Sequence, residues 1–288
     1  MKRKIKIQKA KYIENNTICI EIGYFENENE ECQIEQFKPR TKKVPNTLPS
    51  CIENLSNAFK WNKSEKIKGI EDWDVSEVTD MSYMFFQASN FNQDISNWNT
   101  SNVENMSCMF KGSKSFNQNI NTKIVESKNS RHIAWNVSRV KDMSYMFENC
   151  INFNTPLNSW DTSRVKNMSG MFNQAIKFDQ PINTKEVIMN NKKYTTWNVS
   201  KVTEMNYMFQ NAPSFNQDIS NWNTSNLKLA YAMFQEATSF DQNINTKEVS
   251  VVIKNIKLEI CLTQKIYVIC FMMLKNLIKI FQIEICLT

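Results

Sequence analysis

The tryptophans of this chain recur at two alternating intervals. From Trp73 to Trp222 the sequence numbers of the tryptophans are 73, 98, 135, 160, 197 and 222, so a shorter and a longer interval alternate. Met-Phe pairs keep the same intervals up to Met233-Phe234. The chain is therefore built from a 25-residue repeat unit, with a 12-residue insert at every second junction and a 62-residue longer period. Such strict self-similarity predicts a stack of supersecondary units, none of which could bury its apolar face alone.

Each repeated apolar position is predicted to form one row of the core, with one side chain stacked in every coil. The same positions could instead line a cofactor pocket, but core rows are the favoured interpretation because the positions recur from unit to unit. We therefore assign no catalytic residue, no cofactor-binding residue and no metal ligand. The predicted core rows comprise Trp73, Met84, Phe85, Trp98, Met109, Phe110, Trp135, Met146, Phe147, Trp160, Met171, Phe172, Trp197, Met208, Phe209, Trp222, Met233 and Phe234.

The unit that begins at Trp73 has the pattern of a strand, a helical turn and an irregular return. Val75 and Val78 flank a short extended piece. The apolar residues after it fall at i, i+3, i+4 and i+7, the spacing of one face of a short helix. These residues are Met81, Met84, Phe85 and Ala88. The sequence thus predicts an α/β fold, an elongated, leucine-rich-repeat-like solenoid of 25-residue coils with 12-residue hairpin inserts in alternate coils.

The turn-rich return of the coils carries a repeated Phe-Asn-Gln sequence. It occurs at 91–93, 116–118 and 215–217. We expect these amide side chains to hydrogen-bond the backbone between coils, where an unpaired buried amide would cost about 1–3 kcal/mol. Their predicted role is structural.

The 12-residue inserts are predicted to be β-hairpins. In residues 183–197 two short β runs flank Asn190-Asn191, residues that tolerate positive φ in a tight turn. Residues 121–135 are the equivalent stretch, with 127–130 as the turn. Because one longer period of a regular stack separates the inserts, they should project from one edge, often the binding edge of a repeat protein, although plain decoration of the fold is the alternative. Candidate ligand contacts near the tips are Arg131, Lys192, Lys193 and Tyr194.

Both ends of the chain depart from the repeat. Residues 1–52 form a charged N-terminal segment and linker. Residues 53–249 form the repeat solenoid, in which 53–72 is a degenerate first coil followed by six main coils. Such a capping coil is expected, because the end of a stack must turn a polar face to water. Residues 250–288 form a divergent tail.

The divergent tail keeps the period of the repeat while its residues change. Glu259–Thr263 returns as Glu284–Thr288, one repeat interval further along the chain. In a shifted frame the same codons can encode Trp-Asn-Met-Ser-Asn, if TGA is read as tryptophan, so the tail is interpreted as frame-shifted repeat sequence. An amphipathic surface helix is the alternative. A transmembrane helix is not expected, since the longest uncharged run, Ile266–Leu274, has nine residues against about 20 needed.

The residue inventory argues against catalysis and metal binding. Four glycines in 288 residues are too few for phosphate-binding loops and nucleophile elbows. The eight cysteines form no C-x-x-C pair, so no disulfide is assigned, and His132, the only histidine, offers a zinc ion too few partners. The net charge of +6 comes from basic residues scattered among 29 acidic ones, which predicts no nucleic-acid partner.

The repeat motif resembles that of a known group of surface proteins. The sequences WDVSEVTDMSYMF from Trp73, WNVSKVTEMNYMF from Trp197, and FNQDISNW are similar to the BspA-like leucine-rich-repeat surface proteins, in particular the repeat lipoproteins of mycoplasmas. The resemblance covers about residues 40–249. It implies a secreted lipoprotein with a variable number of repeats and a role in adhesion or host interaction. Mycoplasmas also read TGA as tryptophan, in agreement with the interpretation of the tail.

The expected function is therefore a non-catalytic surface-display or binding module of a bacterial cell surface, with a protein or host-surface ligand as partner. The alternative is a truncated or frame-shifted, non-functional member of a repeat lipoprotein gene array. The resemblance implies the cell surface, whereas the sequence shows no hydrophobic signal segment and no lipid-accepting cysteine, which predicts the cytoplasm for a chain that is complete as given. No cofactor and no transmembrane helix are expected, and the oligomeric state is left open.

Overall fold

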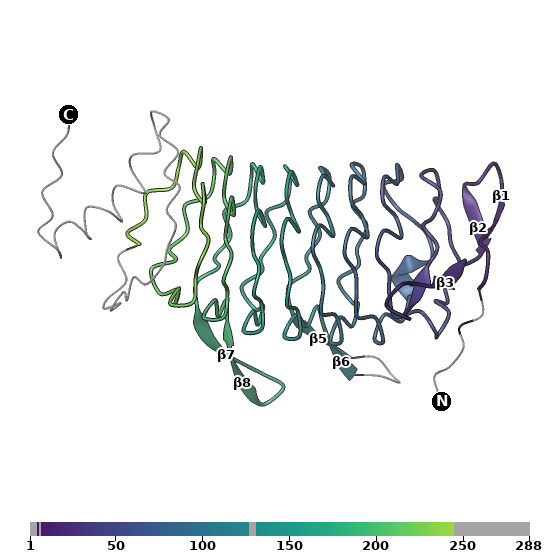
Figure 1. Cartoon of the computed structure of the whole chain (residues 1–288), viewed down its shortest axis with the longest axis horizontal. Coiled ribbons are helices and arrows are strands. Elements are labelled where there is room, and N and C mark those ends of the chain that lie inside the picture. Colours follow the sequence, from purple (N-terminus) through teal and green to yellow (C-terminus); the bar gives the residue numbers. More distant parts are fainter. Residues whose placement is uncertain (1–4, 6, 127–130, 245–288) are drawn as a thin grey trace, which may run out of the picture. The chain divides into compact units, whose positions relative to one another are not determined.

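Consecutive repeat units lie side by side (Figure 1), and backbone bridges join them. The computed structural model describes residues 5, 7–126 and 131–244, all within the unit Met1–Val249. The predicted tail elements at 250–288 lie outside the described residues. Parallel bridges join equivalent residues of neighbouring coils, namely Asn54–Asp80, Asp80–Asn105, Asn105–Asp142, Asp142–Asn167, Asn167–Glu204 and Glu204–Leu229. The sequence repeats are therefore structural repeats arranged in tandem, as predicted.

Regular secondary structure is confined to small strand pairs and one helical turn in the described ranges. The strands form four antiparallel pairs: β1 (Lys11–Ile13) with β2 (Ile18–Glu21), β3 (Tyr24–Glu26) with β4 (Cys32–Ile34), β5 (Lys123–Glu126) with β6 (Arg131–Ala134), and β7 (Lys185–Met189) with β8 (Lys192–Thr196). The one helical element among these residues is a 3-10 turn, η1 (Ile70–Asp72). An α/β description therefore fits the chain poorly.

The short helix predicted across residues 81–88 is wrong. Tyr83 and Gln87 have φ angles of 57° and 56°, in the left-handed region, where an α-helix cannot continue. Alternate N–H groups leave the coil altogether and donate to the next one: Met81 to the oxygen of Asn105 at 2.9 Å, Tyr83 to Ser107 at 2.9 Å, Phe85 to Met109 at 2.8 Å and Gln87 to Lys111 at 2.7 Å. Between them, Met84 and Phe86 donate to the oxygens of Met81 and Tyr83 and close four-residue turns, so the chain advances as successive turns.

The left-handed backbone recurs at the same two positions, i and i+4, in the degenerate first coil and in all six main coils. The pairs are Asn57 and Trp61, Tyr83 and Gln87, Cys108 and Gly112, Tyr145 and Asn149, Gly170 and Gln174, Tyr207 and Asn211, and Ala232 and Glu236. A non-glycine residue in this region costs on the order of 1–2 kcal/mol. The hydrogen bonds between coils must offset that cost, because glycine occupies only two of these positions.

Stacked aromatic rings fill the interior of the coils. Four contacts between Met-Phe phenylalanines have nearly parallel rings and centroid distances of 5.6–5.8 Å, along the row Phe85, Phe110, Phe147, Phe172 and Phe209. A second row joins phenylalanines 91, 116, 153, 178 and 215 at 5.9–6.1 Å. All predicted core residues are buried except Met233, which is half-buried. Burial of these rings is the main stabilising contribution that the described fold offers.

The repeated tryptophans fill the core and also form hydrogen bonds between coils. Each indole N–H donates to a backbone carbonyl of a neighbouring coil: Trp98 to Ile70, Trp135 to Ile95, Trp160 to Ile120, Trp197 to Leu157 and Trp222 to Ile182, at 2.9–3.1 Å. A phenylalanine at these positions would lose this hydrogen bond between coils, although the oxygens of Ile70, Ile95 and Leu157 also accept a backbone N–H. The hydrogen bond therefore explains why this row is tryptophan.

Amide and carboxylate side chains also join successive coils. The side-chain oxygen of Asn92 accepts the N–H of Asn117, and that of Asn117 accepts the N–H of Asn154. The series continues from Asn154 to Asp179 and from Asp179 to Asn216 at 2.9 Å. The prediction that the Phe-Asn-Gln row hydrogen-bonds the backbone between coils is confirmed.

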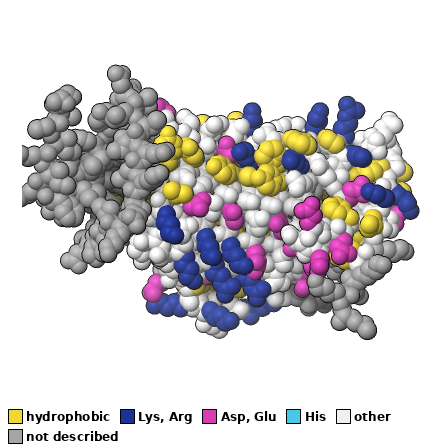
Figure 2. Space-filling model, in the orientation of Figure 1, with side chains coloured by type: hydrophobic (Ala, Val, Ile, Leu, Met, Phe, Trp, Pro, Cys, Tyr) yellow, Lys and Arg dark blue, Asp and Glu magenta, His cyan; other side chains and the backbone are white. Residues whose placement is uncertain are grey.

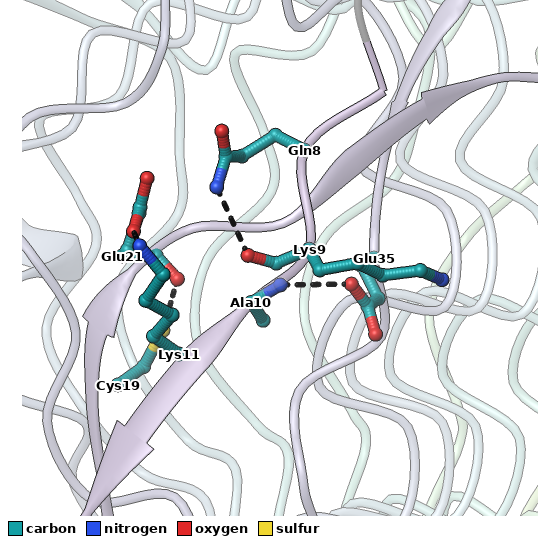
Figure 3. A network of polar contacts seen from close by, with 7 residues as sticks. All are labelled: Gln8, Lys9, Ala10, Lys11, Cys19, Glu21 and Glu35. Atoms are coloured by element: carbon teal, nitrogen blue, oxygen red, sulfur yellow. Dashed lines mark hydrogen bonds and ion pairs between the residues drawn. The ribbon is translucent and has the colours of Figure 1, made fainter.

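Residues that lack the sequence repeat continue the stack at its N-terminal side. Isolated parallel bridges join Ile18 to Lys43 and Lys43 to Lys68, and Phe37 stacks on Phe59 with centroids 4.6 Å apart. Figure 3 shows the polar contacts that hold the first hairpin. The N–H of Ala10 donates to Glu35 at 3.0 Å, and Lys11 forms an ion pair with Glu21 at 2.5 Å (Figure 3).

Truncation of a core methionine should destabilise the stack. Met171 is fully buried in a central coil, so we expect Met171→Ala to lower the free energy of unfolding by about 2–5 kcal/mol through the cavity it leaves. Chemical denaturation measures the loss, and hydrogen exchange should show reduced protection in the adjacent coils. Lys177→Ala, at an exposed position, is the control. Equal stability of the two variants would contradict the core row.

The left-handed positions provide a second test. Gly170 has φ +61°, and a Cβ there would lie 2.2 Å from the Tyr145 ring, so Gly170→Ala should destabilise the chain by about 1–2 kcal/mol. Gln174 occupies the other left-handed position of this coil with an exposed side chain. Gln174→Gly, the matched variant, should not reduce stability, because it removes backbone strain. A loss of similar size in both variants, measured by denaturation, would argue against this explanation.

Candidate functional site

The two predicted insert hairpins are present and project from one edge of the coils (Figure 1). In β7–β8, Lys185 pairs with Thr196 and Met189 with Lys192. Asn190 and Asn191 form the turn, with φ angles of 51° and 58°, as a two-residue hairpin requires. The structural part of the insert prediction is thus confirmed.

The four ligand contacts predicted on these hairpins lie on two different hairpins and have different partners. Arg131 starts β6 and forms an ion pair with Glu126 of β5 at 2.9 Å, whereas Lys193 of β8 pairs with Glu186 of β7 at 2.7 Å. Both pairs are exposed and run across a hairpin, where they contribute roughly 0–1 kcal/mol. They neutralise two of the three cations that were expected to attract a ligand.

Tyr194 acts as an anchor of its hairpin. Its hydroxyl donates to the backbone oxygen of Ser159 at 3.0 Å, and burial raises the pKa of the half-buried phenol. Lys192 is exposed beside the turn and forms no ion pair with any described residue. Of the predicted contacts, therefore, only Lys192 offers a cation that is not already paired.

A larger set of exposed cations lies on the coils themselves. We call it the basic face; it consists of Arg139, Lys141, Arg164, Lys166, Lys201 and Lys228. Figure 2 shows Lys and Arg side chains gathered on one face, over the coils in the C-terminal half of the described stack. The same view shows a band of hydrophobic side chains nearer the other edge of this face.

The local backbone explains why these cations share one face. In the segment 139–141 the residues are exposed, buried and exposed in turn, and 164–166 repeats this alternation around Val165. A period of two is that of extended backbone, in which alternate side chains point the same way. Each of these coils thus presents two cations outward, with a valine between them in the core.

Backbone hydrogen bonds set the cations in register from coil to coil. The N–H of Lys166 donates to the oxygen of Lys141 at 2.8 Å, Thr203 donates to Lys166 at 2.8 Å, and Lys228 donates to Thr203 at 2.9 Å. Strands bonded in this way lie about 4.8 Å apart. The basic face is therefore a line of cations along the stack, interrupted at Thr203.

Few acidic groups neutralise the basic face. Lys141 forms an ion pair with Glu104 at 2.5 Å, and Arg139 donates to the side-chain oxygen of Asn102 at 2.8 Å. Within the part of the chain that the structure describes, the other four cations, Arg164, Lys166, Lys201 and Lys228, have no ion pair. Clustered cations without partners create a positive potential that attracts anions.

An exposed aromatic cluster lies on earlier coils. The ammonium group of Lys60 is 4.6 Å from the ring centroid of Trp61, 5.2 Å from that of Phe86 and 5.6 Å from that of Tyr83. Trp61 is 51% exposed. The ammonium group of Lys60 is already engaged in these cation–π contacts. The cluster therefore attracts an anionic ligand less than the basic face does.

The described residues contain no group of three His, Cys, Asp or Glu side chains able to hold a metal ion. His132, on β6, donates through its Nε2–H to the backbone oxygen of Asn97 at 2.8 Å. Cys150 is fully buried, and burial raises the pKa of its thiol. No helix in the described ranges is long and apolar enough to cross a membrane.

Sequence reasoning missed the basic face because it considered charge along the chain. The signal appears when the repeats are aligned, since one surface position reads Glu77, Asn102, Arg139, Arg164, Lys201 and Asn226, and another reads Thr79, Glu104, Lys141, Lys166, Thr203 and Lys228. Positive residues fill both positions in the two middle coils, at Arg139 with Lys141 and at Arg164 with Lys166, and one position in each of the two coils that follow. When charges are counted along the unaligned sequence, neighbouring acidic residues hide the rise in positive charge at these two positions.

Comparison with known proteins places the chain in a family. Residues 53–129, 122–190 and 185–260 each match the family described as "Mycoplasma protein of unknown function, DUF285". No curated protein and no solved structure matches the chain. The three successive matches cover most of the repeat region and follow its 62-residue period approximately. The chain therefore belongs to the mycoplasma DUF285 family, of which it carries three tandem copies.

Proposed function

We propose that the chain is a non-catalytic binding module of a bacterial cell surface, whose basic face holds an extended anionic ligand of the host. The observation that carries the proposal is the line of cations in register, four of which lack ion pairs among the described residues. The resemblance to BspA-like repeat lipoproteins supports adhesion as the biological role and the cell surface as the location.

The proposed architecture is an elongated solenoid of the leucine-rich-repeat kind. It is supported by the parallel bridges at the repeat intervals and by the rings stacked from coil to coil. In a solenoid each coil contributes the same surface position, so a chemical group is repeated along the stack. Such a surface suits a ligand that is itself a regular polymer.

A linear sulfated polysaccharide fits the basic face better than a nucleic acid does. Proteins that bind single-stranded nucleic acids combine cations with aromatic side chains on which bases stack. The surface positions of the basic face hold cations, amides, threonine and acidic residues, and no aromatic ring. The charge arrangement therefore matches a polymer that presents anionic groups in a line without bases.

The same arrangement is the reason to propose that the chain does not catalyse a reaction. Catalysis needs chemically different groups that converge on one reacting atom. The basic face instead presents the same kind of group on successive coils, at equivalent backbone positions. This arrangement spreads binding along a ligand.

Removal of cations from the basic face should weaken binding of the full chain to an immobilised sulfated glycosaminoglycan. We expect the triple variant Arg164→Ala, Lys166→Ala and Lys201→Ala to lose about tenfold in affinity, since each exposed ionic contact contributes roughly 0.5 kcal/mol. Binding of the unaltered chain should also fall as salt is added. Surface plasmon resonance at several salt concentrations measures both effects.

The matched control removes three cations from the hairpins, as Arg131→Ala, Lys192→Ala and Lys193→Ala. It should keep its affinity within about twofold, because net charge alone has little effect on an exposed contact. An equal loss in both variants would indicate attraction by net charge, and a loss in the hairpin variant alone would move the site to the inserts. Stronger binding to single-stranded DNA or to anionic lipid vesicles than to the polysaccharide would overturn the proposed ligand.

A second possibility is a non-functional, frame-shifted product of a repeat gene array. The observation in its favour is the return of Glu259–Thr263 as Glu284–Thr288 at the 25-residue period of the repeat. If it is correct, the nucleotide sequence over codons 258–288 should encode Trp-Asn-x-Ser and Met-Phe in another frame, at the repeat spacing. A frame without these motifs would show that the tail is an element in its own right.

A further inference from the structure

Two thiols stand in contact at the N-terminal side of the repeat region. The Sγ atoms of Cys32 and Cys51 are 2.8 Å apart, closer than the van der Waals contact of two sulfur atoms and within about 0.8 Å of the length of an S–S bond. Cys32 lies on β4 and is 1% exposed, whereas Cys51 is half-buried. Only a small movement separates this pair from a covalent bond.

The backbone around the pair holds the two segments together. The N–H groups of Glu53 and Asn54 both donate to the oxygen of Cys32, at 3.0 and 3.2 Å, and Gln33 is bridged to Asn54. The next residue after Cys51 closes a turn, with the N–H of Ile52 donating to Pro49 at 3.0 Å. The contact between the thiols therefore follows from backbone geometry on both sides.

A bond at this place would close one coil into a ring. The residues between the two cysteines include Phe37, Val44 and Leu48, all buried, and Phe37 stacks on Phe59 of the following coil. Coils near the end of a stack have the fewest neighbours and open most readily. A covalent closure here would restrain the coils at this side of the repeat region.

We propose that Cys32 and Cys51 form a structural disulfide when the protein meets an oxidising environment, with a disulfide of the glutathione or thiol-oxidoreductase class as oxidant. The Cys51 thiolate attacks one sulfur of the oxidant, whose other sulfur leaves as a thiolate. The Cys32 thiol then loses its proton and attacks Cys51, and the remaining half of the oxidant leaves as a second thiol. Two S–H groups are oxidised to one S–S bond, and the oxidant disulfide is reduced to two thiols.

The order of the two steps follows from the environments of the two thiols. Burial raises the pKa of Cys32, so its thiolate is scarce, and Cys51 is the more accessible sulfur. Of the other described thiols, Cys19 donates to the backbone oxygen of Glu21, Cys150 donates to that of Phe110, and Cys108 is hydrogen-bonded with Tyr83. The proposal is therefore a single bridge among the described cysteines.

The test uses the unaltered full chain, folded and exposed to a mixture of reduced and oxidised glutathione. Free thiols are then alkylated under denaturing conditions, and peptides are identified by mass spectrometry. We expect two of the eight cysteines to escape alkylation and to appear as a peptide linked through Cys32 and Cys51. The same treatment of the urea-unfolded chain should not favour this pair. Full alkylation of the folded chain, or a link that uses other cysteines, would overturn the proposal.

Thermal unfolding of variants separates a structural bridge from an incidental one. Oxidation should raise the apparent Tm of the unaltered chain by a few degrees, on the order of 2–8 °C. Cys51→Ser should show no oxidant-dependent shift, and Cys19→Ser, the control, should retain it. An unchanged Tm in an oxidised chain whose link has been verified would contradict the structural role. Neither readout depends on ligand binding, so failure of the proposed function would leave this result intact.

Discussion

The fold depends on hydrogen bonds between the backbones of neighbouring coils. Alternate N–H groups at 81, 83, 85 and 87 donate to the next coil, and a buried N–H without such a partner would cost about 1–3 kcal/mol. For these N–H groups to point toward the next coil, the chain adopts left-handed backbone at Tyr83 and Gln87. The strained torsions, the absence of α-helix in the described coils and the spacing of the rows are consequences of this one requirement.

Because the hydrogen bonds hold every coil in register, each position of the unit becomes a row. Interior rows must then contain side chains that stack on copies of themselves, and flat rings do this at 5.6–6.1 Å in the two phenylalanine rows. Exterior rows follow the same register without the constraint of packing. Lysine and arginine can therefore accumulate in one exterior row, as at Arg164 and Lys166, while the core remains unchanged.

The sequence was sufficient to predict the repeat period, the buried rows and the hairpins. It was insufficient to predict the path of the backbone within each coil. Trp73 to Trp222 revealed the period, and Asn190-Asn191 revealed a hairpin, because each has a residue signature. The helix was wrong because Met81, Met84, Phe85 and Ala88 must be buried whether the chain forms a helix or successive turns. Positive φ at Tyr83 has no residue signature either, since tyrosine seldom adopts it. The basic face was missed because it exists only in the aligned coils.

A row of equivalent cations on a regular stack has a consequence for ligand recognition. No single contact needs to be strong, because a polymer that satisfies one coil is already positioned for the next, and the backbone register has ordered the cations in advance. Affinity should then depend on the number of uninterrupted coils, with Thr203 dividing Lys166 from Lys228. In such a surface the substitution of one exterior residue changes binding by a small step, whereas the loss of one interior ring disturbs the register of its neighbours. Binding strength can consequently vary through the exterior rows, or through the number of coils, without any change in the core.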